Sequence, residues 1–478
     1  MQTNEYDIII IGSGSGGLTI GLFMSQAGFR VLMISKSDRD IGGDCLNDGC
    51  IPSKALIHVA KIIHNAGLSS EFGLQINGSP DYSKVKAYIR SKQELIREHE
   101  NAGWLQQQGI EVALGGASFA GKNAVEVNGK TYTGKKIVIA TGSVPSGLIV
   151  PGSEKVRFLN NENIFELESL PQKLLVIGGG PIGIELAQAL SRLGCRVTLI
   201  HKGKMILERD ELSLAEILLA RLREEGIIVE LNSTVESFPA SDEATINTNN
   251  GARKTIRFDA VLLAVGRDLS FTSLRLEKGG IQTKDEKIIV DKHLRTTNRN
   301  VFVCGDVAGD LKFSHAAEFH ARILINNFFS PFKKTLHNRH MSWVTFSDPQ
   351  LATFGYSEKQ LKAKNIRYVK AIQDLNMDDR AVVGGFGYGR VILYITPKNI
   401  FGNQKILGGT MIAPEAGELI QELILANTTG MSINAIFNKI YPYPVAARAN
   451  QALVVKLKEQ ELNSTIKKLL KNAFKIFG

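Results

Sequence analysis

The stretch Tyr6-Asp7-Ile8-Ile9-Ile10-Ile11-Gly12-Ser13-Gly14-Ser15-Gly16-Gly17 decides the fold of this chain, because an apolar strand runs directly into a glycine loop. The sequence after it predicts a helix to about Ala27 and a strand from Arg30 to Ser35. This is the G-x-G-x-x-G pattern between a strand and a helix, the context that gives the motif meaning. Its glycines permit a tight turn and a close approach of a pyrophosphate to the backbone. We therefore predict a dinucleotide-binding Rossmann unit.

The pattern occurs again in Lys173-Leu174-Leu175-Val176-Ile177-Gly178-Gly179-Gly180-Pro181-Ile182-Gly183. A helix to about Leu193 and a strand from Arg196 to His201 are expected to follow. One such motif is weak evidence, whereas two in the same context indicate that one chain binds two dinucleotides. No internal repeat beyond these two units is evident.

Two cysteines lie between the glycine loops, in Gly42-Gly43-Asp44-Cys45-Leu46-Asn47-Asp48-Gly49-Cys50-Ile51-Pro52-Ser53-Lys54. Two thiols at this spacing, with glycines before and between them, can close a small disulfide ring. Such a ring is easily reduced and re-formed, so it suits electron transfer better than structural cross-linking. The alternative is a buried pair of unrelated cysteines.

Composition indicates an ordinary globular protein: the 478 residues are 44% apolar and 22% charged. This length has room for roughly three domains of about 150 residues. Four cysteines do not make a disulfide scaffold, which favours a reducing compartment. The N-terminus has no leader pattern, and no run reaches the roughly 18 to 20 apolar residues of a membrane-spanning helix, so we expect a cytoplasmic protein.

The net charge of +10 does not predict nucleic-acid binding, because no recognisable nucleic-acid module accompanies it. The tail from Gln451 to Gly478 alone holds six lysines and two glutamates. Its apolar residues recur at helical spacing: Leu462, Ile466, Leu469, Leu470, Ala473 and Phe477. An amphipathic helix with a lysine face can lie on an anionic membrane surface. A helix packed on a dimer, or a frayed end, is the alternative.

Several motifs in order resemble the class I pyridine nucleotide-disulfide oxidoreductases, which include dihydrolipoamide dehydrogenase, glutathione reductase and mercuric reductase. The resemblance covers about residues 5–450. Beyond the glycine loops and the cysteine stretch, it includes Ala140-Thr141-Gly142-Ser143, Ala264-Val265-Gly266-Arg267 and Cys304-Gly305-Asp306. Two stretches look most like the mercuric-reductase-like branch: the sequence Gly-Gly-Asp-Cys-Leu-Asn at residues 42–47 and Tyr441-Pro442-Tyr443-Pro444.

The resemblance implies an α/β fold with two Rossmann-like three-layer domains and a C-terminal α+β dimerisation domain, assembled as a homodimer. The expected FAD-binding domain is discontinuous, over residues 1–146 and 272–337. The NAD(P)-binding domain is expected over 147–271, the dimerisation domain over 338–450, and the basic tail over 451–478.

The resemblance also implies the cofactors FAD and NADPH or NADH, and no metal. FAD would lie on the first glycine loop with Asp306 at its ribitol, and the nicotinamide nucleotide on the second loop. The expected cofactor-binding residues are Gly12, Gly14, Gly17, Ser35, Lys54, Thr141, Gly142, Gly178, Gly180, Gly183, His201, Lys202, Gly266 and Asp306.

The implied chemistry passes hydride to the flavin and then electrons to a Cys45–Cys50 disulfide. By family analogy, Cys50 is the thiolate stacked on the flavin and Cys45 is the exposed interchange thiol. Lys54 would stabilise the reduced flavin and pair with Glu185. Cys195 and Cys304 are expected to be core residues and not a second redox pair.

The chain departs from the family pattern at two places expected to bind the nucleotides. An acidic residue normally holds the FAD ribose after the second strand, but Ser35 occupies that place here, with Asp38 as a substitute. The corresponding place in the second unit reads His201-Lys202-Gly203-Lys204. Positive charge there suits a 2′-phosphate and favours NADPH. Gly183 argues the other way, because the third glycine is commoner in NAD-binding loops.

The third departure concerns the acceptor. Lipoamide- and glutathione-reducing relatives carry a His-Pro…Glu set near the C-terminus, whereas this chain has Tyr443 and Arg448 in the aligned places. A phenol that titrates near 10 is a poor general base, so fast lipoamide or glutathione turnover is not expected.

Mercuric reductase also has a tyrosine here, but this chain shows neither its C-terminal cysteine pair nor its metal-binding domain. The acceptor stays open between a disulfide, a thiolate-bound metal and a quinone. Mercuric reductase proper, dihydrolipoamide dehydrogenase and a flavin-bearing redox sensor at a membrane are the alternatives.

Overall fold

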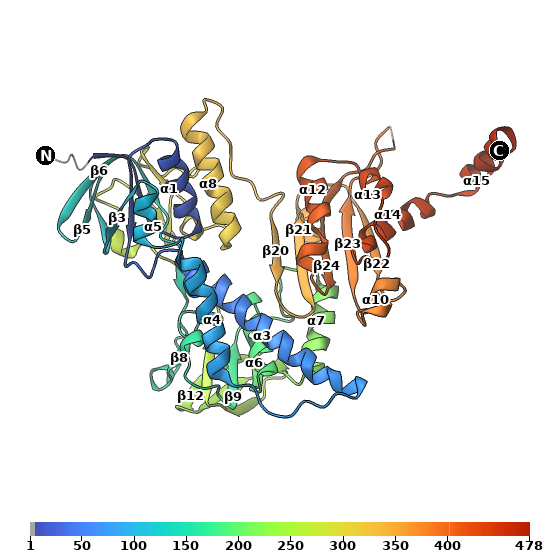
Figure 1. Ribbon diagram of the computed structural model, residues 1–478, viewed down its shortest axis with the longest axis horizontal. Coiled ribbons are helices and arrows are strands. Elements are labelled where there is room, and N and C mark those ends of the chain that lie inside the picture. The colour runs from blue at the N-terminus through green and yellow to red at the C-terminus, as the bar shows by residue number, and fades with distance from the viewer. Residues whose placement is uncertain (1–4, 401) are drawn as a thin grey trace. The chain divides into compact units, whose positions relative to one another are not determined.

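The computed structural model describes residues 5–400 and 402–478. These fall into two compact units (Figure 1). The first unit runs through Ile200 and includes Ser233–Leu336, and the second comprises His201–Asn232 and His337–Gly478. The units do not follow the domain boundaries expected from the sequence, which stay a prediction.

The first glycine-loop unit forms as predicted. Strand β1 (Glu5–Ile11) leads into helix α1 (Ser15–Gln26), and β2 (Val31–Ser35) returns parallel to β1. Both strands read as nearly continuous apolar runs because a central parallel strand is covered on both faces. Tyr6 and Ile8 to Ile11 are accordingly buried.

Strand β1 lies at the centre of the sheet, between β2 and β6, and both neighbours run parallel to it. The strand order is β3-β2-β1-β6-β5-β4, with β19 paired to β6. The remaining bounds are β3 (Ile110–Leu114), β4 (Ala117–Gly121), β5 (Ala124–Val127), β6 (Lys130–Ile139) and β19 (Val301–Val303). Helix α8 (Ser314–Phe329) packs beside α1 on this sheet (Figure 1). Parallel β19 and β1 bring Asp306 and the glycine loop to the same edge of the sheet.

The second glycine-loop unit repeats this arrangement. Strand β9 (Lys173–Ile177) leads into helix α6 (Pro181–Arg192), and β10 (Arg196–Ile200) returns parallel to β9. On its other side β9 pairs in parallel with β15 (Ala260–Leu263), which in turn pairs with β8 (Phe158–Leu159). Both predicted Rossmann-like units are therefore confirmed.

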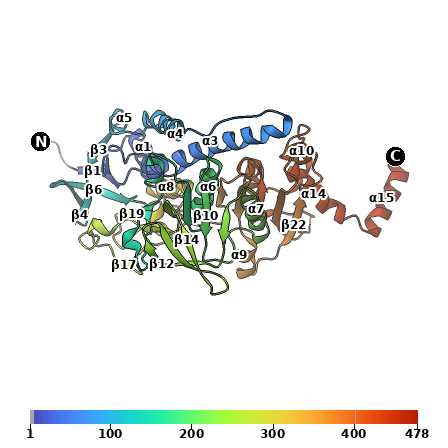
Figure 2. The ribbon, with the colours of Figure 1, turned by 90° about the horizontal axis from the view of Figure 1, so that it is seen from below.

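A helix follows directly from the cysteine stretch. Helix α3 (Cys50–Leu68) begins at the second cysteine and packs against α4 (Tyr82–Arg97) and α6 (Figure 2). The other elements of the first unit are α2 (Gly43–Asn47), α5 (Ala102–Gln107), β7 (Ser143–Pro145), β12 (Thr234–Ala240), β13 (Glu243–Asn247), β14 (Arg253–Arg257), β16 (Arg267–Leu269), β17 (Thr283–Lys284), β18 (Lys287–Ile288) and short 3-10 turns, η1 (Ser69–Phe72), η2 (Ser153–Lys155), η3 (Ile164–Glu166), η4 (Thr272–Leu274) and η5 (Asp306–Ala308).

The second unit is built on an antiparallel sheet in the order β20-β21-β24-β23-β22. Its strands are β20 (Ser342–Thr345), β21 (Gln350–Gly355), β22 (Val369–Asp374), β23 (Arg390–Ile395) and β24 (Ile406–Ala413). Its other elements are α7 (Leu212–Glu224), β11 (Ile228–Glu230), α9 (Glu358–Ala363), α10 (Asp379–Val383), α11 (Ala416–Leu419), α12 (Gln421–Thr429), α13 (Asn434–Asn438), α14 (Arg448–Gln460) and α15 (Ser464–Phe477). The predicted α+β character of this region is confirmed.

One helical stretch of this unit is divided at a single residue. Ile420 has φ and ψ of −86° and −2° and separates α11 from α12. The N–H of Ile420 still bonds to the carbonyl oxygen of Ala416, and its own carbonyl accepts from the N–H of Ile424, so the two helices continue one another.

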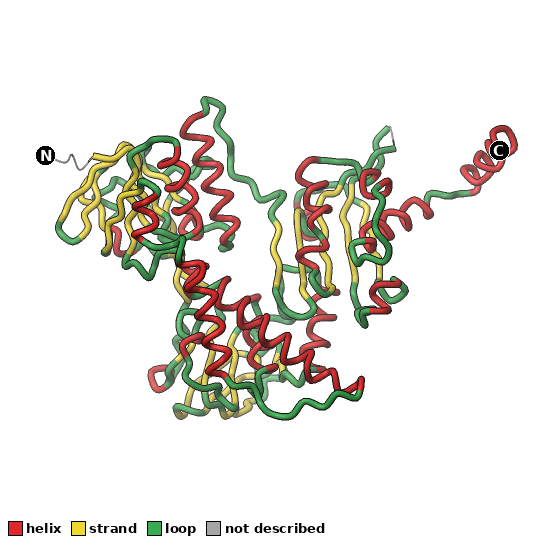
Figure 3. Tube along the Cα trace, viewed as in Figure 1, coloured by secondary structure: helices red, strands yellow, loops and turns green. Residues whose placement is uncertain are grey.

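The predicted tail helix is α15. It begins after Asn463, whose side chain accepts a hydrogen bond from the backbone N–H of Ile466. Every residue of α15 is described and none is buried, and the helix stands clear of the sheet of its unit (Figures 1 and 3). Across the described part of the chain, no helix combines the length and the apolar character needed to cross a bilayer.

Candidate functional site

The first glycine loop is a backbone cradle that side chains would fill. Gly12 has φ of +110°, and a β-carbon there would lie 2.2 Å from the carbonyl oxygen of Ala140. A β-carbon at Gly17 would lie 2.1 Å from the carbonyl oxygen of Gly12. Gly14 precedes α1 and supplies no side-chain cap, so the first N–H groups of the helix face the loop. This geometry fits a pyrophosphate at the helix N-terminus, as FAD requires.

The end of β2 is already hydrogen-bonded within the loop. Ser35 is buried, accepts a hydrogen bond from Ser13 Oγ at 2.8 Å and donates one to the carbonyl oxygen of Ser37. Asp38 Oδ1 accepts from the backbone N–H of Ala102 at 2.7 Å. Asp38 therefore holds the start of α5, and its role at the ribose stays a prediction.

The expected ribitol-binding carboxylate lies in a half-buried polar site. Ser143 Oγ donates to Asp306 Oδ2 at 2.6 Å. Burial raises the pKa of Asp306, and the bond from Ser143 and the charge of Arg267 oppose that rise. His320 is fully buried and contacts the turn that carries Asp306. Its Nδ1 accepts a hydrogen bond from the backbone N–H of Gly305 at 3.2 Å. Sequence reasoning missed His320.

The other residues of the two short motifs shape the backbone nearby. The Thr141 hydroxyl donates to the carbonyl oxygen of Ser270. Gly142 has φ of +69°, and its carbonyl accepts from the N–H of Ser270. Gly266 has φ of +152°, a conformation that favours glycine.

The cysteines lie in the segment Gly43–Cys50, called here the cysteine segment. Both are free thiols; Cys45 is on α2 and Cys50 is the first residue of α3. A hydrogen bond between the two thiols raises the pKa of Cys45 and lowers that of Cys50. The segment approaches the first glycine loop closely, since a β-carbon at Gly43 would lie 2.6 Å from the Cα atom of Gly14.

Two further groups stabilise a Cys50 thiolate. The Ser314 hydroxyl lies 3.4 Å from Cys50 Sγ, and with the charge of Lys54 it lowers the pKa of that thiol. Ser314 is the first residue of α8, more than 260 residues away in the sequence. No sequence motif marks it, so sequence reasoning missed it.

The expected ion pair forms. Lys54 Nζ, on α3, donates to Glu185 Oε2, on α6, at 2.8 Å. The Glu185 side chain is 7% exposed and that of Lys54 is 35% exposed. The pair thus joins the helix that starts at Cys50 to the helix that starts at the second glycine loop.

The second glycine loop has the same construction as the first. Gly178 has φ of +118°, and a β-carbon there would lie 2.3 Å from the carbonyl oxygen of Ala264. A β-carbon at Gly183 would lie 1.9 Å from the carbonyl oxygen of Gly178. Gly180 precedes α6 without a side-chain cap, and Pro181 occupies the first helical turn. This loop also fits a dinucleotide pyrophosphate.

The basic residues expected near the nicotinamide nucleotide belong to the second unit. His201 is half-buried, and burial lowers its pKa, so it is neutral at pH 7. Lys202 and Lys204 are exposed. Positive charge in this stretch therefore comes from the lysines and not from the histidine.

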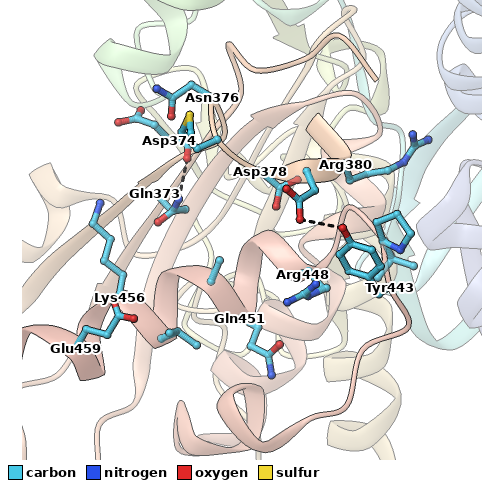
Figure 4. A pocket seen from close by; sticks show the side chains of 16 residues that line it. Gln373, Asp374, Asn376, Asp378, Arg380, Tyr443, Arg448, Gln451, Lys456 and Glu459 are labelled. Atoms are coloured by element: carbon cyan, nitrogen blue, oxygen red, sulfur yellow. Dashed lines mark hydrogen bonds between the residues drawn. The ribbon is translucent and has the colours of Figure 1, made fainter. Parts of the chain in front are cut away.

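Tyr443 lies in the second unit, in an open pocket of about 620 Å³ (Figure 4). The residues that line it include Asp374, Asp379, Arg380, Arg448 and Glu459. The phenol donates to Asp379 Oδ2 at 3.0 Å, and the Arg448 guanidinium lies 5.2 Å from the ring centroid. Asp379 raises the pKa of Tyr443, which lowers the fraction of phenolate, the form that can accept a proton, at neutral pH.

Comparison with protein families gives two matches. Residues 6–321 match the family described as pyridine nucleotide-disulphide oxidoreductase, and residues 341–453 match the dimerisation domain of that family. Together they cover most of the chain.

Proteins similar to this chain include mercuric reductases, dihydrolipoyl dehydrogenases and a flavoprotein disulfide reductase. Mercuric reductase of Bacillus cereus is 30% identical over 457 residues, 94% of this chain and 71% of that protein. Dihydrolipoyl dehydrogenase of Geobacillus stearothermophilus is 32% identical over 451 residues, 92% and 93% of the two chains. Among solved structures, the HOCl-induced flavoprotein disulfide reductase RclA of Escherichia coli is similar with a TM-score of 0.82. It shares 25% identity, and the match covers 94% of this chain and 99% of RclA.

Proposed function

The chain belongs to the class I pyridine nucleotide-disulphide oxidoreductases, enzymes that use FAD and NAD(P)H, and we propose that its redox pair is Cys45 with Cys50. The dimerisation domain indicates a homodimer. One observation carries the proposal. Cys50 begins the helix whose Lys54 pairs with Glu185 at 2.8 Å, and Glu185 lies on the helix that follows the second glycine loop.

Residues of the first unit are suited to bind the pyrophosphate and the ribitol of FAD. Gly12, Gly14 and Gly17 would hold its pyrophosphate, and Asp306 its ribitol. When bound, FAD supplies two-electron transfer between the nicotinamide and the cysteine pair.

The two thiols differ in protonation when the pair is reduced. With its pKa lowered by Cys45, Ser314 and Lys54, Cys50 is the thiolate of the reduced pair. With its pKa raised, Cys45 holds the proton. Reduction of the disulfide therefore places a negative charge at Cys50 and a proton at Cys45 Sγ, and re-oxidation must release that proton. Lys54 compensates the charge at Cys50 and is oriented by Glu185.

Tyr443 supports the proposal that the acceptor is neither lipoamide nor glutathione. Its phenol is bonded to a carboxylate and cannot take a proton from an attacking thiol at neutral pH. The acceptor classes that remain are a disulfide that is reduced slowly, a thiolate-bound metal and a quinone. Mercuric reductase proper is the second candidate, because that relative is 30% identical over nearly the whole chain.

The proposed coenzyme is NADPH, with NADH as the alternative. Exposed Lys202 and Lys204 follow the second strand of the second glycine-loop unit, where a carboxylate would stand for NADH. Lysine side chains at that place favour a 2′-phosphate.

An anaerobic titration of the FAD-loaded protein tests the pair and the coenzyme together. NADPH and NADH are added separately and the absorbance is followed. A long-wavelength thiolate-to-flavin band after two electrons is expected, at lower NADPH than NADH concentrations. Bleaching of the flavin without that band would show that the cysteines are not coupled to it.

The proposal extends to a cytoplasmic enzyme with peripheral membrane contact through α15. Five apolar side chains of the helix are at least half exposed: Leu469, Leu470, Phe474, Ile476 and Phe477. Lys467, Lys468, Lys471 and Lys475 occupy the other arc of the helix, and no acidic residue follows Glu461. Exposed apolar residues with uncompensated lysines match an anionic lipid surface in shape and in charge.

Binding to vesicles tests this contact. The full chain and a chain truncated after Gln460 are sedimented with vesicles of pure phosphatidylcholine or of phosphatidylcholine with 30% (roughly physiological) phosphatidylserine. Only the full chain should bind, only to the anionic vesicles, and less at high salt. Equal binding of both chains contradicts the membrane contact. A change in oligomeric state on truncation would assign α15 to the dimer instead.

A further inference from the structure

The cysteine segment is held from outside by a closed set of polar side chains. Asn161 Nδ2 donates to Asp44 Oδ1 at 2.9 Å and to the carbonyl oxygen of Asp48 at 3.2 Å. One buried amide is thereby bonded on both sides of Cys45, to the residue before it and to a residue close to Cys50. Asp44 precedes Cys45 directly, and Asp48 lies two residues before Cys50.

Arg267 completes the set. Its Nη2 lies 3.2 Å from Asp44 Oδ1, and its Nη1 donates to Asn161 Oδ1 at 3.3 Å. The Arg267 side chain is 12% exposed and that of Asp44 is 43% exposed, so solvent partly screens this ion pair. Asp44, Asn161 and Arg267 thus contact one another pairwise.

The same arginine reaches the expected FAD site. Arg267 Nε donates to Ser143 Oγ at 2.8 Å, and Ser143 Oγ donates to Asp306 Oδ2 at 2.6 Å. The ion pair with Asp44 therefore anchors the cysteine segment to the motif that carries Asp306. A rigid element on one side of the segment fixes where its sulfurs lie.

We propose that Asp44, Asn161 and Arg267 are positioning residues that hold Cys45 beside Cys50 and thereby stabilise the disulfide relative to the dithiol. This inference rests on the proposed function, in which the two cysteines are a redox pair. A restrained segment keeps each thiol at a high effective concentration for the other. When the segment is released, the dithiol gains conformational freedom that the closed ring cannot gain, so reduction becomes easier.

The equilibrium with glutathione measures this effect. Two glutathione thiols reduce the protein disulfide: the Cys45–Cys50 bond breaks, one S–S bond forms between the glutathiones, and two electrons pass to the protein. One proton goes to Cys45 and the other to solvent, because Cys50 stays a thiolate. The FAD-loaded protein is equilibrated at a series of glutathione ratios, quenched by alkylation, and the two cysteines are counted by mass spectrometry.

Two variants separate positioning from charge. Asn161→Ala removes the three hydrogen bonds of the amide without altering any charge, and Asp44→Asn removes the ion pair while keeping the side-chain volume. Each should raise the dithiol-to-disulfide ratio at a fixed buffer by about tenfold, which is about 30 mV for two electrons. Asn163→Ala is the matched control, because Asn163 bonds only within its own turn, to Asn160 and Phe158. The control should stay within about twofold of the unmodified protein.

The outcomes are distinguishable. An unmodified protein whose cysteines never form the disulfide at any glutathione ratio contradicts the proposed function, and this inference with it. A protein that titrates, beside an Asn161→Ala or Asp44→Asn variant that is unchanged or harder to reduce, contradicts this inference alone. If Asn161→Ala does not fold, Asn161→Ser takes its place, because it also leaves every charge unchanged, including the charge of Asp44 that raises the pKa of Cys50.

Discussion

The cysteine segment holds the proposed redox pair, and the Tyr443 pocket holds the residue aligned with the acid–base histidine of relatives. The two regions are built differently. Around Cys45 and Cys50, side chains from five separate stretches of the first unit converge through buried or half-buried contacts. Tyr443 is 66% exposed, and its partners Asp379 and Arg448 come from nearby elements of the second unit.

This difference shows which region the fold fixes. Buried polar contacts are strong and are costly to leave incomplete, so the thiols of the cysteine segment have tuned pKa values and defined positions. In the single chain, the Tyr443 phenol and the Asp379 carboxylate are exposed, so their hydrogen bond contributes little. We therefore expect substitutions at the cysteines to have large effects and substitutions at Tyr443 to have small ones.

The largest expected effect comes from Cys45→Ser. Transfer of electrons to disulfide acceptors should fall by at least ~1,000-fold, because a hydroxyl cannot replace the interchange thiol. The flavin absorbance should still bleach on addition of NAD(P)H. Steady-state turnover and anaerobic spectra measure the two steps. Undiminished turnover would remove the cysteine segment from the pathway and break the contrast with Tyr443.

A smaller but still clear effect is expected from Lys54→Met. Removing the cation bonded to buried Glu185 should lower the free energy of unfolding by about 2 kcal/mol, less than for a fully buried pair because Lys54 is partly exposed. Urea denaturation measures it. The double variant Lys54→Met with Glu185→Gln should recover part of the loss. Additive losses in that cycle would show that the pair is not coupled.

The carboxylate of Asp48 should make stability depend on pH. Burial and the nearby charge of Asp44 raise the pKa of Asp48 to about 7, whereas in the unfolded chain it ionises near its ordinary value. Ionisation therefore costs the folded state stability as pH rises from about 4 to about 7. Asp48→Asn should gain about 1 kcal/mol at pH 8 relative to its effect at pH 4.5, since solvent screens a half-buried group. A gain that is equal at the two pH values would contradict the raised pKa.

The smallest effect is expected from Tyr443→His. Lipoamide reduction should rise by less than about tenfold, because Arg448 stands where a glutamate would orient the imidazole. Tyr443→Phe is the control for loss of the bond to Asp379, and steady-state assays with lipoamide and NAD(P)H measure both. A gain of several hundredfold would show that Tyr443 alone sets the acceptor, and that the second region is as decisive as the first.

Much of this architecture was predictable because it depends on short-range patterns. The two glycine loops, the buried positions of Cys195 and Cys304 and the tail helix all follow from local sequence. Each reflects spacing within one or two turns of structure, where side-chain periodicity and backbone freedom act directly.

The contacts between distant stretches needed the tertiary structure. Lys54 and Glu185 were expected as a pair only from the family resemblance. Ser314 beside Cys50 and His320 behind Gly305 carry no motif at all. Arg267 was quoted only as part of a motif, and nothing in the sequence connected it with Asp44 or Asn161.

The sequence by itself determined the class of protein, two dinucleotide cradles and a candidate redox pair, because glycine spacing and cysteine spacing are local properties of the chain. Only the tertiary structure showed which side chains lower the pKa of Cys50, what contacts the cysteine segment and that α15 exposes its apolar face. Those outcomes depend on burial and on side chains brought together from more than 100 residues away, and local sequence patterns do not encode either.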